Sequence, residues 1–592
     1  MPEADQANPR GSDDPPYKTT VVRLANMQNR VRVGIFAAVL LPTLVPAVSA
    51  REPTRGTHGM VVAQEPIASE VGLAVLKSGG NAVDAAVAVG FALAVTHPSA
   101  GNIGGGGFML VRLADGRTTF LDFRESAPKK ADRDMYLGPD GEATKDSIYG
   151  WRSSGVPGTV SGLAMAHKEF GTKSWSDLLA PAIHLAHDGF VVSESLSSSL
   201  RSEPHLPLDP ESKRIFLRGS NYYSSGETLK QPELADTLER IAREGTLGFY
   251  GGLTAQRLAA AMAEHGGLIT AADLKDYKTI EREPLNGDYK GFHILTAPPP
   301  SAGGIGLLQI MGMLKGTHYE SDGPNSTKAV HYEAEAMRRF YADRSEYMGD
   351  SDFYVVPVKP LLDPSYLAKR RASIDPNHAT PSEFVEPGLP KALNAGVSWR
   401  ESSETTHYNV VDARGNAVAV TYTLNNSFGN GITVPGLGFL LNDEMDDFVS
   451  KPGAPNMFGM VGGDANAIEP GKRPLSSMTP TIITKDGKLF MAVGAPGGSR
   501  ITTGVTEVIL DVIDFHLNAQ DAVDLPRFHQ QWKPDILYLQ SGFPATSEEA
   551  LKKMGYEVKS TGGVARVEAI VVRNGKFEGG TESRLSGKVA AY

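Results

Sequence analysis

Two threonine hydroxyls are predicted to meet at the open end of a β-hairpin. Residues 404–425 read ETTHYNVVDARGNAVAVTYTLN, in which two runs rich in Thr, Val and Tyr flank the turn-forming DARGN. If the hairpin is symmetric about Arg414, Thr405 lies directly opposite Thr423. Opposed residues have Cβ atoms about 4.5–5.5 Å apart, so one hydroxyl can orient the other for nucleophilic attack. A bulge at Gly415 would shift the register by one residue and separate them.

The composition leaves few other covalent catalysts. The chain has 592 residues and no Cys, which excludes disulfides, Cys-ligated zinc, iron–sulfur clusters and cysteine nucleophiles. Any covalent mechanism must therefore use Ser, Thr, Lys, Asp, Glu, His or Tyr. Threonine is also a good strand former, and Thr–Thr pairs are common in ordinary sheets. From the hairpin alone, a catalytic pair and a structural pair both stay open.

Other motifs of catalysis and binding are missing from the sequence. It contains no GxxxxGK[ST], HExxH or GxSxG, and the glycine-rich run at 101–107 does not fit GxGxxG. His184 and His187 stand one helical turn apart, but no Asp, Glu or His pattern completes a metal site around them. We therefore expect neither metal nor cofactor. A net charge of −10 without a basic block argues against nonspecific nucleic-acid binding.

Helices and strands that could position such a hairpin follow from the hydrophobic pattern. An apolar helix at 81–96, capped by Asn81, is too short and carries Asp84 too early to span a membrane, so it predicts a buried core helix. We see no internal repeat or flexible linker, which indicates one compact unit. Further helices are expected at 66–77, 175–188, 231–244, 254–265, 328–347, 501–515 and 547–554, and strands at 108–112, 118–122 and 489–493.

The N-terminal residues 1–50 are predicted to be an extension with a signal peptide. An apolar run at 33–48 follows two arginines and ends in the small residues typical of a cleavage site, with Ala50 last. Residues before Met27 are polar and Pro-rich, which suggests translation from Met27. We expect a periplasmic or secreted mature chain beginning near Arg51, without a stable membrane anchor.

Seven segments resemble, in order, the signatures of the γ-glutamyltranspeptidase family (γ-glutamyltransferases). The resemblance runs from about residue 56 to the end of the chain and is specific because several long motifs occur in sequence. They are KSGGNAVDAAVAVGFALAVTHPSAGNIGGGGFML (77–110), LDFRESAP (121–128), PPPSAGGIG (298–306), TTHYNVVDARGNAVAVTYTLNNSFG (405–429), NDEMDDF (442–448), GKRPLSSMTPTI (471–482) and GAPGGSRI (494–501).

This resemblance implies an N-terminal-nucleophile hydrolase, an α+β protein built as a four-layered αββα sandwich. Its precursor would cut itself between Glu404 and Thr405 into a large subunit, 51–404, and a small catalytic subunit, 405–592, which form a heterodimer. The freed α-amine of Thr405 has an ordinary pKa of about 7.7–8.0 and can serve as its own base. Thr423 would orient Thr405. We expect His407 to pack or pair within its strand rather than act as the base.

The resemblance also implies the remaining site residues. Gly497 and Gly498, between a strand and a helix, would offer backbone N–H groups to an oxyanion. The planar guanidinium of Arg124 suits the α-carboxylate of a γ-glutamyl donor. The other substrate-binding residues are two hydroxyl donors for that carboxylate, two acids for the α-ammonium and one further polar contact, namely Ser476, Ser477, Glu444, Asp447 and Asn425.

The implied activity is transfer of the γ-glutamyl group from glutathione and similar donors to water, amino acids or peptides. A glutaryl- or cephalosporin-type acylase of the same superfamily is an alternative, although its acyl group has no ammonium and would not need both Glu444 and Asp447. A non-catalytic secreted homologue is another, and it predicts one uncut chain. The loop 455–463 resembles a bacterial lid, with Phe458 where relatives carry Tyr.

Overall fold

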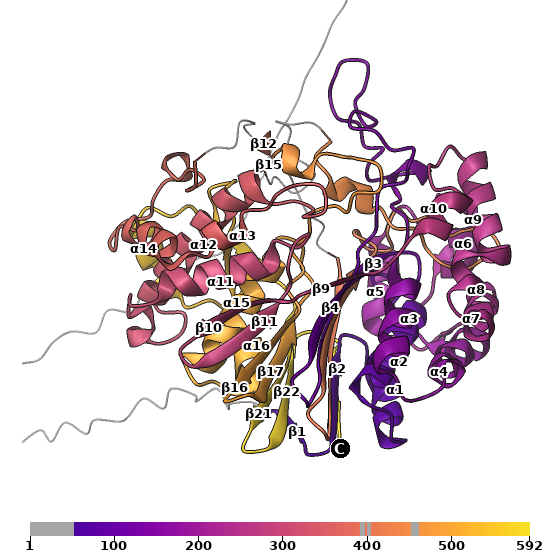
Figure 1. Cartoon of the computed structure of the whole chain (residues 1–592), viewed down its shortest axis with the longest axis horizontal. Helices are drawn as coiled ribbons and strands as arrows, with labels where there is room; N and C mark the ends of the chain where they lie inside the picture. The colour runs from indigo at the N-terminus through magenta and orange to yellow at the C-terminus, as the bar shows by residue number, and fades with distance from the viewer. Residues whose placement is uncertain (1–51, 391–396, 399–403, 451–460) are drawn as a thin grey trace, which may run out of the picture. The chain divides into compact units, whose positions relative to one another are not determined.

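Two antiparallel sheets stack face to face in the computed structural model, and helices cover the outer face of each (Figure 1). The structure describes residues 52–390, 397–398, 404–450 and 461–592, which fall within one compact unit, Arg51–Tyr592. These layers form the predicted αββα sandwich. The predicted signal peptide at 33–48, the start at Met27 and most of the loop 455–463 with Phe458 lie outside the described residues.

The sheet that contains the predicted hairpin, here called the hairpin sheet, has seven strands among the described residues. In spatial order they are β23 (Lys588–Ala591), β2 (Gly59–Ala63), β13 (Thr406–Asp412), β14 (Ala417–Thr423), β3 (Gly106–Arg112), β4 (Thr118–Phe123) and β9 (Ile280–Arg282). The second sheet, in the same part of the chain, runs β1 (Thr54–Gly56), β22 (Lys576–Thr581), β21 (Glu568–Arg573), β17 (Lys488–Gly494), β16 (Thr481–Lys485), β11 (Phe292–Thr296) and β10 (Leu285–Tyr289).

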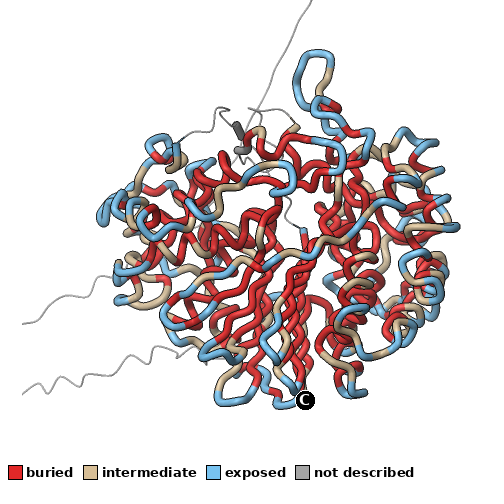
Figure 2. The backbone as a smooth tube through the Cα atoms, viewed as in Figure 1, coloured by how far each residue is buried: buried red, intermediate tan, exposed pale blue. Residues whose placement is uncertain are grey.

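Each sheet has its own helical layer, and buried residues fill the interior between the layers (Figure 2). The hairpin sheet is covered by helices that include α1 (Pro66–Lys77), α2 (Ala82–Thr96), α3 (Thr159–Phe170), α4 (Trp175–Asp188) and α7 (Pro232–Glu244). The second sheet is covered by helices that include α11 (Gly303–Leu314), α12 (Thr327–Tyr347), α14 (Pro364–Ala372) and α15 (Arg500–Ile513). Beyond these lie α9 (Gly252–Glu264) and α17 (Ala545–Lys553).

The two-residue period of the strands divides the core. In β3, Phe108 and Leu110 pack in the cluster that includes the second sheet, whereas Met109 and Val111 pack in the cluster that includes α1 and α2. Successive side chains of a strand point to opposite faces, so one strand serves both layers. The hairpin sheet is therefore apolar on both faces.

Helix α2 lies directly against the hairpin and is buried along its whole length, as predicted. The hydroxyl of Tyr408 donates to the carbonyl oxygen of Ala86 at 2.9 Å, and that of Tyr422 donates to Gly90 at 2.9 Å. A Cβ on Gly90 would lie 2.9 Å from the Tyr408 hydroxyl, so a small residue is needed there. These contacts set the position of both hairpin strands.

The expected helices are present, with end shifts of up to two residues, and α1 and α4 match at both ends. The glycine run before residue 108 differs from expectation, because Gly106 and Gly107 extend β3 and pair with Thr423 and Tyr422. A Cβ on Gly107 would lie 2.3 Å from the carbonyl oxygen of Thr421. The absent side chains thus let two strands approach. No helix in the described part of the chain combines the length and apolarity needed to cross a membrane.

Candidate active site

The hairpin brings the two predicted threonine hydroxyls together. β13 and β14 pair in the predicted register, with Thr406 opposite Tyr422 and no bulge between them. Thr405 Oγ1 lies 3.3 Å from Thr423 Oγ1. Both side chains are buried, so their hydroxyls interact in surroundings where water competes weakly.

The peptide bond before Thr405 lies against both hydroxyls. Thr405 Oγ1 and Thr423 Oγ1 each lie 2.8 Å from the carbonyl oxygen of Glu404. The Thr423 hydroxyl accepts a hydrogen bond from the backbone N–H of Asn425 at 2.8 Å, which leaves its own proton for the Glu404 carbonyl. Because a donor on the oxygen makes the carbonyl carbon more electrophilic, the arrangement suits attack by the neighbouring Thr405 hydroxyl.

Gly497 and Gly498 connect β17 to α15 in conformations that favour glycine. Their φ angles are 135° and 56°, and a Cβ on Gly497 would lie 2.8 Å from Ala565 Cα. Within the described residues, neither glycine N–H donates a hydrogen bond. Helix α15 begins directly afterwards, at Arg500. Free amides at a helix N-terminus can stabilise an anionic oxygen, so the loop can form the predicted oxyanion hole.

One arginine meets three carboxylates in the same region. Arg124 forms ion pairs with Glu444 and Asp447, and its Nη1 lies 3.8 Å from Glu125 Oε2. All four side chains are buried. With every group ionised, one positive and three negative charges give a net charge of −2. An added ammonium group would reduce this imbalance, because it supplies a positive charge where water is excluded.

The protonation of this cluster reflects burial first and neighbouring charges second. Burial raises the pKa of Glu125 to about 7, although Arg124 opposes the shift. Burial also raises the pKa of Glu444 well above its usual range. For Arg124 burial would lower the pKa, but Glu444 and Asp447 outweigh it and the pKa is raised. Arg124 thus stays charged, and burial favours the protonated forms of Glu125 and Glu444.

Glu125 is the member of this cluster that the sequence analysis missed. It follows Arg124 in LDFRESAP, a run whose charges predict a solvated surface. In the structure its side chain is fully buried, and neither carboxylate oxygen has a hydrogen-bond partner among the described residues. In the sequence, the only indication of a role for Glu125 was its position next to Arg124. Only its burial in the structure shows that it belongs to the charged cluster.

The segment 298–306 holds the predicted serines in place. The backbone N–H of Ser476 donates to the carbonyl oxygen of Pro300 at 2.9 Å, and that of Ala302 donates to Ser476 at 2.8 Å. The Ser301 hydroxyl donates to Met478 at 2.7 Å. These backbone contacts fix the loop on which Ser476 and Ser477 stand, so a motif distant in sequence positions both hydroxyls.

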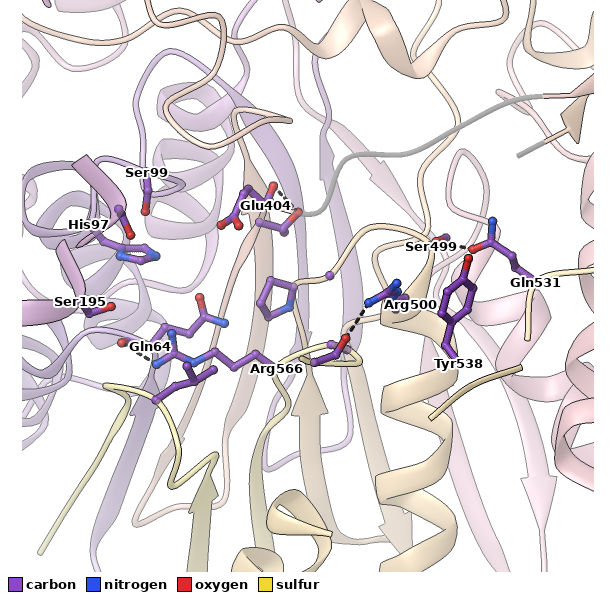
Figure 3. A pocket seen from close by; sticks show the side chains of 17 residues that line it. Gln64, His97, Ser99, Ser195, Glu404, Ser499, Arg500, Gln531, Tyr538 and Arg566 are labelled. Atoms are coloured by element: carbon purple, nitrogen blue, oxygen red, sulfur yellow. Dashed lines mark hydrogen bonds between the residues drawn. The ribbon is translucent and has the colours of Figure 1, made fainter. Parts of the chain in front are cut away.

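Two cavities meet at Thr405, which is the one residue among those the structure describes that lines both. The small cavity has a volume of about 20 Å³, which is room for about one water molecule. Every predicted site residue lines it except Glu404 and Gly497. Those two line the large cavity, whose volume is about 580 Å³ (Figure 3). The structure therefore brings all the predicted residues around one threonine.

His407 pairs within the hairpin, as expected from the sequence. His407 Nδ1 lies 2.8 Å from Thr421 Oγ1, and burial lowers the pKa of this histidine to about 3. It pairs within the sheet and is neutral. His187 forms an exposed pair with Asp188, and no group of three potential metal ligands gathers anywhere in the described ranges.

Comparisons with known proteins agree with this arrangement. Residues 68–592 match the Gamma-glutamyltranspeptidase family. The chain is 49% identical over 547 residues to a glutathione hydrolase proenzyme from Pseudomonas sp. (strain A14), which covers 91% of this chain and 94% of that protein.

Two solved structures are also similar. Cephalosporin acylase from Bacillus halodurans matches with a TM-score of 0.80 and 28% identity, over 93% of this chain and 99% of that chain. Helicobacter pylori gamma-glutamyltranspeptidase matches with a TM-score of 0.56 and 42% identity, over 58% of this chain and 99% of that chain. The fold, the threonine pair and the matched sequence together establish that this chain belongs to the gamma-glutamyltranspeptidase family.

Proposed function

We propose that the protein hydrolyses glutathione and similar γ-glutamyl amides and transfers the γ-glutamyl group to water, amino acids or peptides. The observation that carries this proposal is the position of Thr405 between two cavities, one lined by Arg124 with Glu444 and Asp447. That cavity offers both signs of charge to a zwitterionic acyl group. The other offers space for the amine portion.

Self-cleavage of the precursor comes first. Thr405 Oγ1 attacks the carbonyl carbon of Glu404, the C–N bond breaks, and an ester joins the two residues. Water then hydrolyses the ester, which leaves a carboxylate on Glu404 and a free α-amine on Thr405. The products are a large subunit, 51–404, and a small subunit, 405–592.

Strand pairing would hold these two subunits together after the cut. β13 pairs with β2, and β14 pairs with β3, across the proposed cleavage point in the sequence. β23, at the end of the chain, pairs with β2 on its other side. Cutting one peptide bond breaks none of these pairings, so the product is a heterodimer with one shared sheet.

Donor binding exchanges one set of ion pairs for another. The α-carboxylate of the γ-glutamyl group pairs with Arg124, and the α-ammonium pairs with Glu444 and Asp447. Ser476, Ser477 and Asn425, which line the same cavity, add hydrogen bonds. Because the donor head group carries both charges, it enters without a net change in buried charge. The cavity must widen as these pairs separate, since its volume of about 20 Å³ is too small for the acyl chain.

The chemical step uses the threonine and its own amine. The α-amine takes the proton of Thr405 Oγ1, which attacks the γ-carbonyl carbon, and the N–H groups of Gly497 and Gly498 stabilise the oxyanion. Collapse of the intermediate breaks the amide bond and protonates the leaving amine. Water or another amine then attacks the ester and restores Thr405.

The competing function is that of an acylase that removes a glutaryl group. The structural similarity to a cephalosporin acylase favours this alternative. A glutaryl group carries a carboxylate for Arg124 but no ammonium. It would draw Arg124 away from Glu444 and Asp447 and leave two buried acids without a cation, which is costly. The charge of the small cavity therefore favours the γ-glutamyl group.

The deciding experiment compares γ-glutamyl-4-nitroanilide with glutaryl-4-nitroanilide on the processed enzyme. We expect kcat/KM to be higher for the γ-glutamyl compound by about 100-fold or more, the cost of leaving one buried charge unpaired. Equal rates, or faster release from the glutaryl compound, would favour the acylase. Failure to cleave either compound, together with an uncut chain, would favour a non-catalytic homologue.

We further propose export across the cytoplasmic membrane. The apolar run at 33–48 and the small residue Ala50 support a signal peptide that is removed before Arg51. The protein would then act in the periplasm or outside the cell. N-terminal sequencing of the mature large subunit tests this, with a start close to Arg51 expected.

A further inference from the structure

Among the described residues, Thr405 alone lines both the large cavity and the proposed γ-glutamyl pocket. The glycine loop divides them, because Gly498 lines the small cavity and Gly497 lines the large one. Pockets for small molecules have volumes of roughly 300–1,000 Å³. At about 580 Å³ the large cavity can accept an amino acid or a short peptide.

The charged lining of this cavity is mainly basic. Arg500 and Arg566 line it, and Glu404 is the one acid among the lining residues that the structure describes. Figure 3 shows these side chains around the same opening. His97 adds no charge, because burial and the nearby Arg566 lower its pKa to about 3. Cutting the chain after Glu404 makes that residue a new chain end with a second carboxylate, and the two arginines still line the cavity.

The two arginines are not equally available to a ligand. Arg500 Nη1 donates to Gly563 at 2.6 Å and to Thr561 at 3.1 Å, and its guanidinium stacks over the Tyr538 ring at 5.2 Å. It holds the cavity wall together. A ligand would have to break those contacts to use it.

Arg566 has donors to spare. Its Nη2 donates to the carbonyl oxygen of Gln64 at 3.1 Å, and its Nε lies 3.7 Å from Glu568 Oε1 without a hydrogen-bond partner among the described residues. A guanidinium carries five N–H donors in a planar arrangement. The Arg566 side chain lines the large cavity and is 14% exposed, so part of it is open to a ligand while its Nε is buried.

The backbone that carries Arg566 is fixed relative to the glycine loop. Arg527 donates to the carbonyl oxygens of Val564 at 2.9 Å and Ala565 at 3.3 Å, and pairs with Glu582. Ala565 has a φ of 55° and lies directly against Gly497. Arg566 is thus held at a set position from the proposed oxyanion hole, and through it from the reacting carbonyl.

The uncut chain already presents a carboxylic acid to this arginine. Glu404 lines the cavity with Arg566, and each side chain affects the other electrostatically. Glu404 is exposed, and the positive charge of Arg566 acts to lower the pKa of its carboxyl. An acid one residue from the Thr405 nucleophile is therefore within the electrostatic reach of Arg566.

We propose that Arg566 is the carboxylate-binding residue of an amine subsite formed by the large cavity. The ligands are amines with a free carboxylate: the peptide that leaves from a glutathione-like donor, and the amino acid or peptide that accepts the γ-glutamyl group. This inference rests on the function proposed above. It deepens that function by assigning one side chain to both amines.

Both amines use the same subsite because transfer retraces the release step. The leaving amine departs from the γ-carbonyl carbon as its C–N bond breaks, and it takes the proton that left Thr405 Oγ1. The acceptor nitrogen attacks the same carbon, the C–Oγ1 bond breaks, and the acceptor proton returns through the α-amine to Oγ1. A carboxylate held by Arg566 orients either nitrogen at that carbon.

The experiment uses pairs of substrates that differ only in the carboxylate. Glutathione and its C-terminal amide test the leaving amine through release of glutamate. Glycylglycine and glycylglycinamide test the acceptor, with γ-glutamyl-4-nitroanilide as the donor. In the wild type we expect kcat/KM to be about tenfold higher for glutathione and for glycylglycine than for the corresponding amides. A factor of this size is the effect of one charge-assisted hydrogen bond.

The variant Arg566→Met removes the charge and keeps most of the side-chain volume. We expect it to abolish both tenfold preferences and, for glutathione and glycylglycine, to raise KM more than it lowers kcat. Arg566→Lys should retain part of the preference, since it keeps the charge. Arg573→Met, which changes an arginine on β21 that does not line the cavity, should match the wild type.

The outcomes separate this inference from the proposed function. If the wild type cleaves γ-glutamyl-4-nitroanilide but shows no preference for either carboxylate, the inference is wrong and the function stands, whether or not the variant folds. If the preference for the carboxylate over the amide persists in Arg566→Met, the inference is also wrong. If Arg566→Met removes that preference for only one of the two amines, they do not share a single subsite. If γ-glutamyl-4-nitroanilide is not cleaved at all, the proposed function itself fails.

Discussion

The two cavities that meet at Thr405 differ in both volume and charge. The small one, of about 20 Å³, is filled by an arginine and its paired acids, whereas the large one, of about 580 Å³, has two arginines and open space. In a pocket where an arginine is already paired with acids, a ligand must supply a carboxylate for the arginine and a cation for the acids. Such a pocket therefore selects a ligand that carries both charges. An open cavity with one available arginine selects only for a carboxylate. We therefore expect narrow specificity for the acyl group and broad specificity for the amine.

The shared residue gives the largest expected effect. Thr405→Ala should stop self-cleavage and lower γ-glutamyl hydrolysis by about 10⁴-fold or more, because loss of a covalent nucleophile removes the whole pathway. Denaturing electrophoresis should show two bands for the wild type and one for the variant. The neighbouring Thr406→Ala should still be cut, because Thr406 shares a strand face with Tyr408, which contacts α2, and lies opposite the face of Thr405. Two bands for Thr405→Ala would refute its role.

Thr423 links the two cavities, since it lines the small one and hydrogen-bonds Glu404, which lines the large one. Thr423→Val should slow self-cleavage by about 10²–10³-fold, the usual cost of removing one donor from a developing oxyanion. The time course of the two bands on a gel measures this. Thr423→Ser keeps the hydroxyl and serves as the control. An unchanged time course for Val would mean that this hydrogen bond does not assist the cut.

A change confined to the small cavity should affect the donor and spare the amine. Asp447→Asn leaves the shape similar but removes one acid that faces the ammonium, so KM for γ-glutamyl-4-nitroanilide should rise by about 30-fold. The preference over glutaryl-4-nitroanilide should fall with it. Asp276→Asn, which changes an exposed acid paired with Lys129, is the matched control. If Asp447→Asn lowered kcat/KM equally for the γ-glutamyl and the glutaryl anilide, Asp447 would not be the source of the selectivity.

The smallest expected effect concerns pH and Glu125. Burial raises its pKa to about 7, so it is largely protonated below that pH in the free pocket. A bound ammonium favours the ionised form, so ligand affinity should increase as pH rises through 7 and then level off. Calorimetry with L-glutamate between about pH 5.5 and 8.5 should show close to a tenfold change per unit at the acidic end.

Glu125→Gln should flatten this profile, because an amide does not titrate. L-Glutamate is not turned over, so the measurement reports binding and not the chemical step. The same slope in Glu125→Gln and wild type would assign the titration to another group of the cluster, with Glu444 as the first to test.

Local features of the site were predictable because neighbouring residues determine them. The pairing of Thr405 with Thr423 depends on one turn and two short strands, so the register could be derived from the sequence of the hairpin. Helix α2 was predictable from its cap and its uniform apolarity. The functional meaning of Arg124 and Glu444 was not derivable in this way. It came from resemblance to a family.

Long-range features depended on how the layers pack. Arg124 meets Asp447 across more than 300 residues of sequence, and Glu125 became part of the site only because that region is buried. Arg566 was not singled out at all, because its importance depends on a cavity formed by segments from both ends of the chain.

The sequence by itself determined the register that pairs Thr405 with Thr423 and the family, since these depend on short-range pairing and on continuous motifs. Only the tertiary structure decided that Thr405 stands between a small, charge-paired cavity and a large, basic one. Their volumes and charges arise from side chains brought together by the stacking of two sheets, and no local pattern records that stacking.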